Sequence, residues 1–109
     1  MAQEYVLLNE KDGEIGEIAL SKNVFELIAD ITLDDVDSVE RIPATKFSKA
    51  ISCKIINNQL HIAVDVKLKY GANVNATCEI LQNRIYQNIL DMTNMKCGSV
   101  DVHVVGFNI

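Results

Sequence analysis

The stretch LHIAVDVKLKYG, residues 60–71, decides the fold because apolar and polar residues alternate along it until a glycine ends the pattern. Such alternation is typical of a strand with one buried and one solvated face. Apolar residues then recur at helical spacing over Asn73–Met92, and alternation returns at Val100–Val104. This order predicts a strand, a turn at Gly71, a helix of about five turns and a further strand.

The same spacing predicts which side chains are buried. The strand is expected to bury Leu60, Ile62, Val64, Val66, Leu68 and Tyr70, and to expose His61, Ala63, Asp65, Lys67 and Lys69. The helix, capped by Asn73 or Asn75, is expected to bury Val74, Cys78, Leu81, Ile85, Ile89 and Met92. The sheet is therefore expected to have one face covered by helix and one face in water.

A second amphipathic helix is predicted in the first half of the chain, after Ser21 as its N-cap. Its core-facing stripe is predicted at Val24, Leu27, Ile28 and Ile31, and the residues facing away at Lys22, Asn23, Glu26 and Asp30. We expect this helix to end within Thr32–Asp35, where polar turn-forming residues gather.

Shorter segments complete the predicted sheet. Tyr5–Leu8 is expected to be an edge strand or a loose terminus, and Glu40–Lys49, which contains the only proline, an irregular loop. A strand is predicted whose shared face carries Ile51, Cys53 and Ile55, followed by a hairpin connection at Asn57, Asn58 and Gln59.

The element order is therefore β-α-β-β-α-β, which predicts an α+β two-layer sandwich of ferredoxin-like or KH-like character. Both helices are expected on one face of a mixed or antiparallel sheet. With 109 residues and 49% hydrophobic content, the chain is predicted to form a single domain over residues 1–109. Residues 1–12 are a candidate loose N-terminal extension.

Composition limits the classes of function. A formal charge of −5 opposes a phosphate backbone, so nucleic acid is not an expected partner. No stretch approaches the roughly 18 apolar residues of a membrane span, and the first residues lack a signal-peptide pattern, so we expect a cytoplasmic protein without direct membrane insertion. The cysteines Cys53, Cys78 and Cys97 are predicted to be reduced thiols, because their number is odd and their spacing unpatterned.

Parity places His61 and Asp65 on the polar face of one predicted strand, and Asp101 and His103 on the polar face of another. If the two strands are adjacent, two imidazoles and two carboxylates gather into a candidate metal site. No ligand-spacing motif supports that site, so the favoured interpretation is a solvated sheet face.

Other candidate sites are weaker. Cys97 lies in a predicted loop beside Lys96, but no base stands at the spacing of a nucleophilic pair. Gly71–Val74 offers backbone N–H groups at a helix N-terminus, yet it lacks the further glycines and the lysine of a phosphate loop. We favour a structural cysteine and a plain turn.

Two charged groups complete the survey. The acidic residues Asp30, Asp34, Asp35, Asp37 and Glu40 lack the spacing of a calcium loop, and a solvated helix end is favoured. The lysines Lys54, Lys67 and Lys69 are too sparse, and have too few aromatic neighbours, for an RNA-binding sheet. The residues alone thus predict no catalytic, cofactor-binding or metal-binding site.

Several short motifs occur in order along most of the chain. They are Gly13-x-Ile15, Ile18-x-x-Ser21-x-x-Val24-x-x-x-Ile28-Ala29, Val66-x-Leu68-x-Tyr70-Gly71, Gln82, Asp91-Met92-Thr93 and Val100-x-Val102-x-Val104-x-Gly106. In this combination the chain resembles the alkaline-shock-protein or general-stress family of Gram-positive bacteria. It departs from the family pattern at Ser38-Val39, where relatives usually have Gly-Val, and in Glu40–Lys49, which lacks their frequent glycines.

The resemblance implies a non-enzymatic cytoplasmic protein without a cofactor, linked to envelope and alkaline stress. Some relatives are held near the membrane by a separate anchor protein, and others are encoded beside fatty-acid metabolism genes. We therefore expect a homo-oligomeric scaffold or adaptor whose partner is a membrane-anchored protein or a fatty-acid-synthesis enzyme. The alternatives are a regulator of a lipid-synthesis enzyme, a KH-like RNA-binding module, and an enzyme using Cys97 or the His61 and His103 face.

Overall fold

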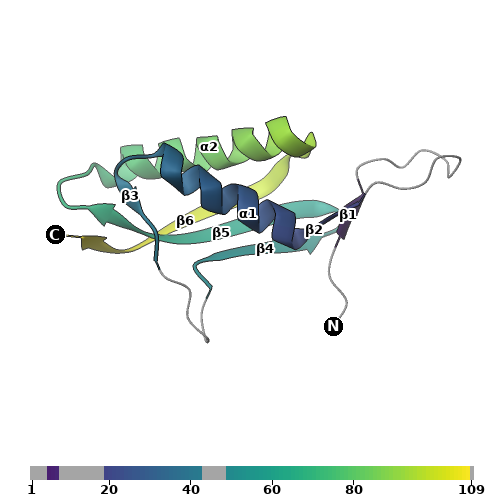
Figure 1. The fold of residues 1–109 in the computed structure, drawn as a ribbon, viewed down its shortest axis with the longest axis horizontal. Coiled ribbons are helices and arrows are strands. Elements are labelled where there is room, and N and C mark those ends of the chain that lie inside the picture. The colour runs from purple at the N-terminus through teal and green to yellow at the C-terminus, as the bar shows by residue number, and fades with distance from the viewer. Residues whose placement is uncertain (1–4, 8–18, 43–48, 109) are drawn as a thin grey trace, which may run out of the picture.

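The computed structural model describes residues 5–7, 19–42 and 49–108. Their elements, in chain order, are β1 (Tyr5–Leu7), β2 (Ala19–Ser21), α1 (Lys22–Thr32), the 3-10 turn η1 (Leu33–Asp35), β3 (Val39–Glu40), β4 (Ile51–Ile56), β5 (Gln59–Lys69), α2 (Val74–Thr93) and β6 (Cys97–Asn108). Both helices lie over the same face of the main sheet (Figure 1). The predicted α+β two-layer sandwich is confirmed.

Strand β5 is the centre of a mixed sheet. Strands β4 and β3 pair with β5 antiparallel, over Gln59–Val64 and Lys67–Leu68 respectively. Strand β6 pairs with β5 in parallel, as expected when a helix connects two neighbouring strands. Strands β1 and β2 form a separate two-stranded sheet.

The core lies between this sheet and the two helices. The residues of β5 predicted to face inward are fully buried, with exposed fractions of 0 or 1%: Leu60, Ile62, Val64, Val66 and Leu68. Tyr70 departs from the prediction, because it follows the last residue of β5 and is 76% exposed. Gly71 has a φ of +91° and turns the chain there, so the alternation of faces ends before Tyr70.

Asparagines shape the turns around β5 and α2. A hairpin connects β4 and β5 as the sequence predicts, but its loop is Asn57 and Asn58 alone, both with positive φ, because the predicted third loop residue, Gln59, is the first residue of β5. Of the two predicted caps for α2, Asn73 is the one observed, since its Oδ1 accepts the N–H of Ala76 at 3.0 Å. Asn94, with a φ of +60°, ends the same helix.

Helix α2 buries its predicted stripe in the middle but not at its ends. Leu81, Ile85 and Ile89 are buried, whereas Val74 and Met92 are exposed and Cys78 is half-buried. Thr93 takes the inner position at the C-terminal end, because its hydroxyl donates to the Ile89 carbonyl at 2.6 Å and accepts the N–H of Met95 at 3.2 Å. A hydroxyl satisfied in this way is buried without an unpaired polar atom.

The predicted orientation of α1 is wrong in part. Its buried residues are Phe25, Ile28, Ala29 and Thr32, while Leu27 and Ile31 are 60% and 43% exposed. Most positions from 24 to 31 are apolar, and the large Phe25 ring occupies the core in place of Leu27. Ser21 precedes the helix as predicted, but its side chain makes no capping hydrogen bond.

The predicted order of elements also needs correction. Pairing with β5 begins at Val39–Glu40, where the expected irregular loop starts, and the N-terminal strand belongs to a separate small sheet. The last strand extends beyond Val100–Val104 to the bounds of β6, so Cys97 lies in the strand and not in the predicted loop. Two predicted segments lie outside the described residues. They are residues 43–48 of the expected loop and residues 1–4 and 8–12 of the candidate extension.

Candidate functional site

The four residues of the candidate metal site share the open face of the sheet, as predicted. The register places Asp65 beside His103, Ala63 beside Asp101, and His61 beside Ser99. The His61 Nδ1 lies 3.0 Å from the Ser99 hydroxyl, and the two groups are hydrogen-bonded. Within residues 5–7, 19–42 and 49–108, no three His, Cys, Asp or Glu side chains gather closely enough to hold a metal ion. The geometry therefore supports a solvated polar face.

Cys97 is the first residue of β6, where the sequence predicts a loop, and its inner position opposite Leu60 leaves it half-buried. Burial raises the pKa of its thiol to about 11. A thiol with this pKa is almost fully protonated near neutral pH and is a poor nucleophile. The position is that of a packing residue.

The Gly71 turn precedes the backbone N–H groups at the start of α2. The turn is closed by a hydrogen bond in which the Ala72 N–H donates to the Lys69 carbonyl at 3.1 Å. One N–H of the first turn of α2, that of Ala76, is already taken by the Asn73 side chain. This arrangement is a capped helix start, as the favoured interpretation has it.

Arg41 organises the acidic group at the end of α1. Its Nη1 and Nη2 contact the two carboxylate oxygens of Asp34 at 2.5 and 3.0 Å, and its Nε contacts Asp30 Oδ1 at 3.0 Å. These hydrogen bonds lower the pKa of Asp34 and raise that of Arg41. A guanidinium thus holds carboxylates that the sequence left as a candidate cation site.

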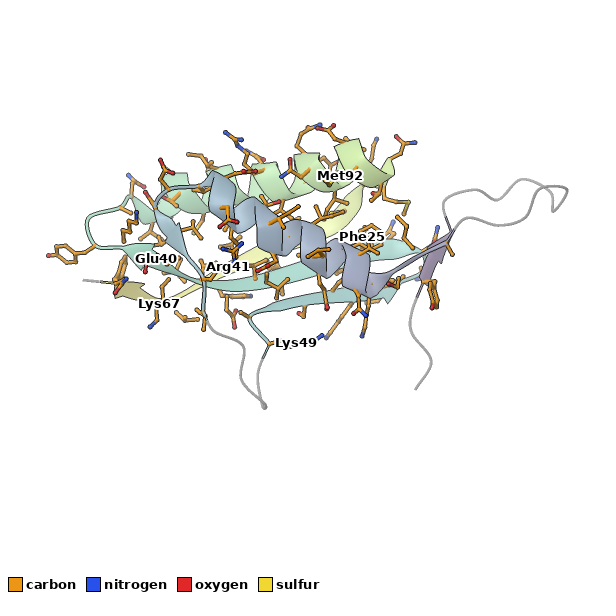
Figure 2. The ribbon with its side chains drawn as sticks, viewed as in Figure 1. Phe25, Glu40, Arg41, Lys49, Lys67 and Met92 are labelled. Atoms are coloured by element: carbon orange, nitrogen blue, oxygen red, sulfur yellow. The ribbon has the colours of Figure 1, made fainter. Side chains whose placement is uncertain are left out.

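A hollow of about 690 Å³ lies between the outward side of α1 and the beginning of β4. Its lining residues are Asn23, Glu26, Leu27, Asp30, Arg41, Ile42, Lys49, Ala50 and Ile51. The lining combines the apolar side chains of Leu27, Ile42 and Ile51 with four charged residues. Arg41 and Lys49 both lie on the lower side of α1 in Figure 2.

Glu26 joins α1 to β4 at this hollow. Its Oε2 accepts the backbone N–H of Cys53 at 3.0 Å, and its Oε1 accepts Lys49 Nζ at 3.2 Å. The side chain is only 15% exposed, although the helical pattern predicts it in solvent. Since Glu26 turns towards β4, the next residue, Leu27, points outward beside the hollow.

The sequence prediction missed this surface because it assigned one apolar stripe to α1. The segment VFELIADI, residues 24–31, carries more apolar residues than one stripe contains. Phe25, Ile28 and Ala29 fill the core, and Leu27 and Ile31 remain outside, one turn apart. The excess of apolar residues is the signal from which an exposed face could have been predicted.

Comparison with known proteins adds the family. The family model for alkaline shock protein 23, described as having a cell envelope-related function, matches residues 10–109. The chain belongs to this family. Among its relatives is the uncharacterized protein YqhY of Bacillus subtilis, 22% identical over 91% of this chain and 82% of YqhY. Another is the uncharacterized protein Spy1535 of Streptococcus pyogenes, 24% identical over 84% of this chain and 79% of Spy1535.

Within this family member, residues that carried the resemblance hold the fold together. Gln82 Nε2 donates to the Val100 carbonyl at 3.1 Å and so ties α2 to β6. Gly71 and Thr93 shape the two ends of α2.

No solved structure matches the chain. Of the helices in the described residues, neither is long and apolar enough to cross a membrane.

Proposed function

We propose that this protein is a non-catalytic scaffold or adaptor of the cell envelope, acting in the cytoplasm through self-association and through a protein partner. The observation that carries the proposal is the outward surface of α1, where Leu27 and Ile31 stand exposed one turn apart and Leu27 lines the hollow. Exposed apolar side chains that gather in this way are typical of interaction sites.

The chemistry of this surface fits an apolar segment of a partner protein. Covering the exposed parts of Leu27 and Ile31 contributes about 1 to 2 kcal/mol each. Ile42 and Ile51 extend the apolar lining. The ion pairs from Arg41 to Asp30 and from Lys49 to Glu26 border it, which gives the polar rim usual at protein interfaces.

The other candidate sites support binding over catalysis. The half-buried Cys97 thiol has a raised pKa, and the His61 imidazole is engaged with Ser99. The described residues that line the hollow beside α1 include no Ser, Cys, Thr or His to form the pair of nucleophile and base that covalent catalysis uses. An envelope-related binding protein accounts for the family and for this surface together.

The partner decides between the two forms of the proposal. A membrane-anchored protein on the α1 surface makes the chain an adaptor, whereas a lipid-synthesis enzyme on the same surface makes it a regulator. Both forms place the contact at Leu27 and Ile31.

A capture experiment tests this proposal. The tagged protein, a Leu27→Glu, Ile31→Glu variant and an Ile80→Glu variant are each incubated with detergent-extracted envelope proteins, and retained proteins are identified by mass spectrometry. Ile80 is the matched control, because it is an exposed isoleucine on α2. We expect one partner to be retained at the same level by wild type and I80E and to be lost from the double variant. Equal retention by all three proteins contradicts a binding role for the α1 surface.

A further inference from the structure

Strand β6 pairs with β5 alone among the described residues, which leaves its other edge without a strand. On β5, the N–H of Asp65 donates to the Ala50 carbonyl at 2.7 Å, on the side of β4. Successive residues of a strand direct their backbone groups to opposite edges, so Val64 directs its groups to β6. In the parallel register Val64 stands beside Val102.

In a parallel ladder, the bonds from a residue reach the two neighbours of its partner. The N–H and C=O of Val102 therefore point away from β5, as do those of Val100 and Val104. The Val100 carbonyl agrees with this direction, since it accepts the Gln82 side chain from α2, and its second lone pair can accept an N–H of a further strand. The remaining groups form a row that a further strand can pair with.

The side chains of β6 are complementary to those of a second β6 strand that runs in the opposite direction. Antiparallel pairing of two β6 strands about Val102 places Asp101 of each copy opposite His103 of the other. A carboxylate and an imidazole that face each other across strands can share a hydrogen bond, whereas two carboxylates facing each other are destabilising. Val100 and Val104 also direct their backbone groups away from β5 and could stand at the centre of the pair. A centre at Val100 places Asp101 opposite Ser99, and a centre at Val104 places it opposite Phe107, so the complementarity is lost in both cases.

The same register matches an exposed ring to a hollow. Phe107 stands beside Leu68 on the helix side of the sheet and is 48% exposed. In the pair centred on Val102, Phe107 of the second copy comes beside Cys97. A hollow of about 300 Å³ lies there, lined in part by Cys97 and Tyr86. An exposed apolar ring and a concave surface thus meet in one arrangement.

We propose that two copies of this chain pair antiparallel through the free edges of β6, with the two-fold axis at Val102, to form one continuous sheet. This inference rests on the self-association included in the proposed function, and it names the surface and the register. The contact is isologous, since each copy contributes the same residues, and it therefore forms a closed dimer.

Hydrogen–deuterium exchange of single amides across a dilution series tests the edge. The amides of Asp101 and His103 point to β5 and should be protected at every concentration, so they serve as internal controls. The amides of Val102 and Val104 should gain at least tenfold protection as the mass measured by sedimentation rises from 12.1 kDa to twice that value. A dimer whose Val102 and Val104 amides exchange as fast as in the monomer overturns the edge pairing and leaves self-association through another surface. A monomer at all concentrations overturns both.

Charge exchange tests the register. His103→Asp places a carboxylate opposite Asp101 twice in each dimer, and should raise the dimer dissociation constant about tenfold. The double variant D101H, H103D reverses the pairs and should restore dimerisation to within about threefold of wild type. Both variants place a carboxylate beside Asp65 of the same chain, so restoration cannot arise within one copy. Equal dimerisation of all three proteins, or no restoration in the double variant, overturns the Val102-centred register.

Discussion

Helices α1 and α2 cover the same face of one sheet, but they are attached to it by different means. Helix α2 packs through Leu81, Ile85 and Ile89, and its exposed apolar residues, Val74, Ile80 and Met92, are each more than one turn from the next. Helix α1 is shorter and exposes Leu27 and Ile31 one turn apart, and Leu27 lines a hollow.

Polar contacts supplement the apolar packing of α1. Glu26 accepts the Cys53 N–H, Arg41 holds Asp30, and the Thr32 hydroxyl accepts Asn88 Nδ2 at 2.9 Å. A helix that polar groups orient in this way does not need every apolar side chain for its own packing. The remaining apolar residues of α1 are therefore free to bind a partner.

The largest expected difference is between a core residue of α2 and an outward residue of α1. Leu81→Ala should lower the free energy of unfolding by about 2 to 5 kcal/mol, because Leu81 is fully buried. Leu27→Ala should lower it by about 0.5 kcal/mol or less, as is usual for surface substitutions. Urea unfolding measures both. Similar losses in the two variants would show that Leu27 belongs to the core.

Removal of the Glu26 carboxylate tests the polar attachment of α1. Glu26→Ala leaves the Cys53 N–H without this acceptor and should lower the free energy of unfolding by about 1 to 3 kcal/mol. Lys49→Ala is the control, because Lys49 is an exposed partner of the same carboxylate and should matter by about 0.5 kcal/mol or less. If E26A is as stable as K49A, the Glu26 to Cys53 bond does not hold the helix.

The two helix starts offer a smaller contrast. Asn73→Ala should lower stability by about 1 kcal/mol, since the Asn73 side chain caps α2. Ser21→Ala should have less effect, because the Ser21 hydroxyl makes no capping bond to α1. Thermal unfolding of the two variants, followed by circular dichroism, measures the difference. Equal shifts would remove this distinction between the helices.

The smallest expected effect depends on pH. Arg41 lowers the pKa of Asp34 from its ordinary 3.8, so the folded chain releases this proton at lower pH than the unfolded chain. The contribution of the pair to stability is therefore complete above the ordinary value and is lost as pH falls through the lowered pKa. Asp34→Asn should be slightly less stable than wild type at about pH 6, and the difference should shrink towards about pH 2. A difference independent of pH would exclude the ion pair as its source.

Local patterns in the sequence were sufficient for the centre of the fold. Alternation over residues 60–68, positive φ at Asn57 and Asn58, and the Gly71 turn each follow from residue type and immediate neighbours. The stripe Leu81, Ile85 and Ile89 was likewise predicted, because the rest of α2 is polar enough to leave one choice.

The candidate surface could not be predicted in the same way. In α1, the choice between Phe25 and Leu27 for the core depends on how the helix packs against β4 and α2, which no local period encodes. Glu26 was predicted to face solvent, and its role depends on Cys53, 27 residues later. The bulges of β6 between its pairs with Leu60 and His61 and with Val66 and Lys67 also depend on the neighbouring strand.

The central claim is that the outward surface of α1 carries the envelope-related function. Its most direct test is the fraction of the protein that sediments with the envelope after cells expressing wild type, L27E with I31E, or I80E are broken and fractionated. We predict that wild type and I80E sediment with the envelope, and that the double variant stays in the supernatant while remaining as stable as I80E. Sedimentation of the folded double variant at the wild-type level would contradict the claim.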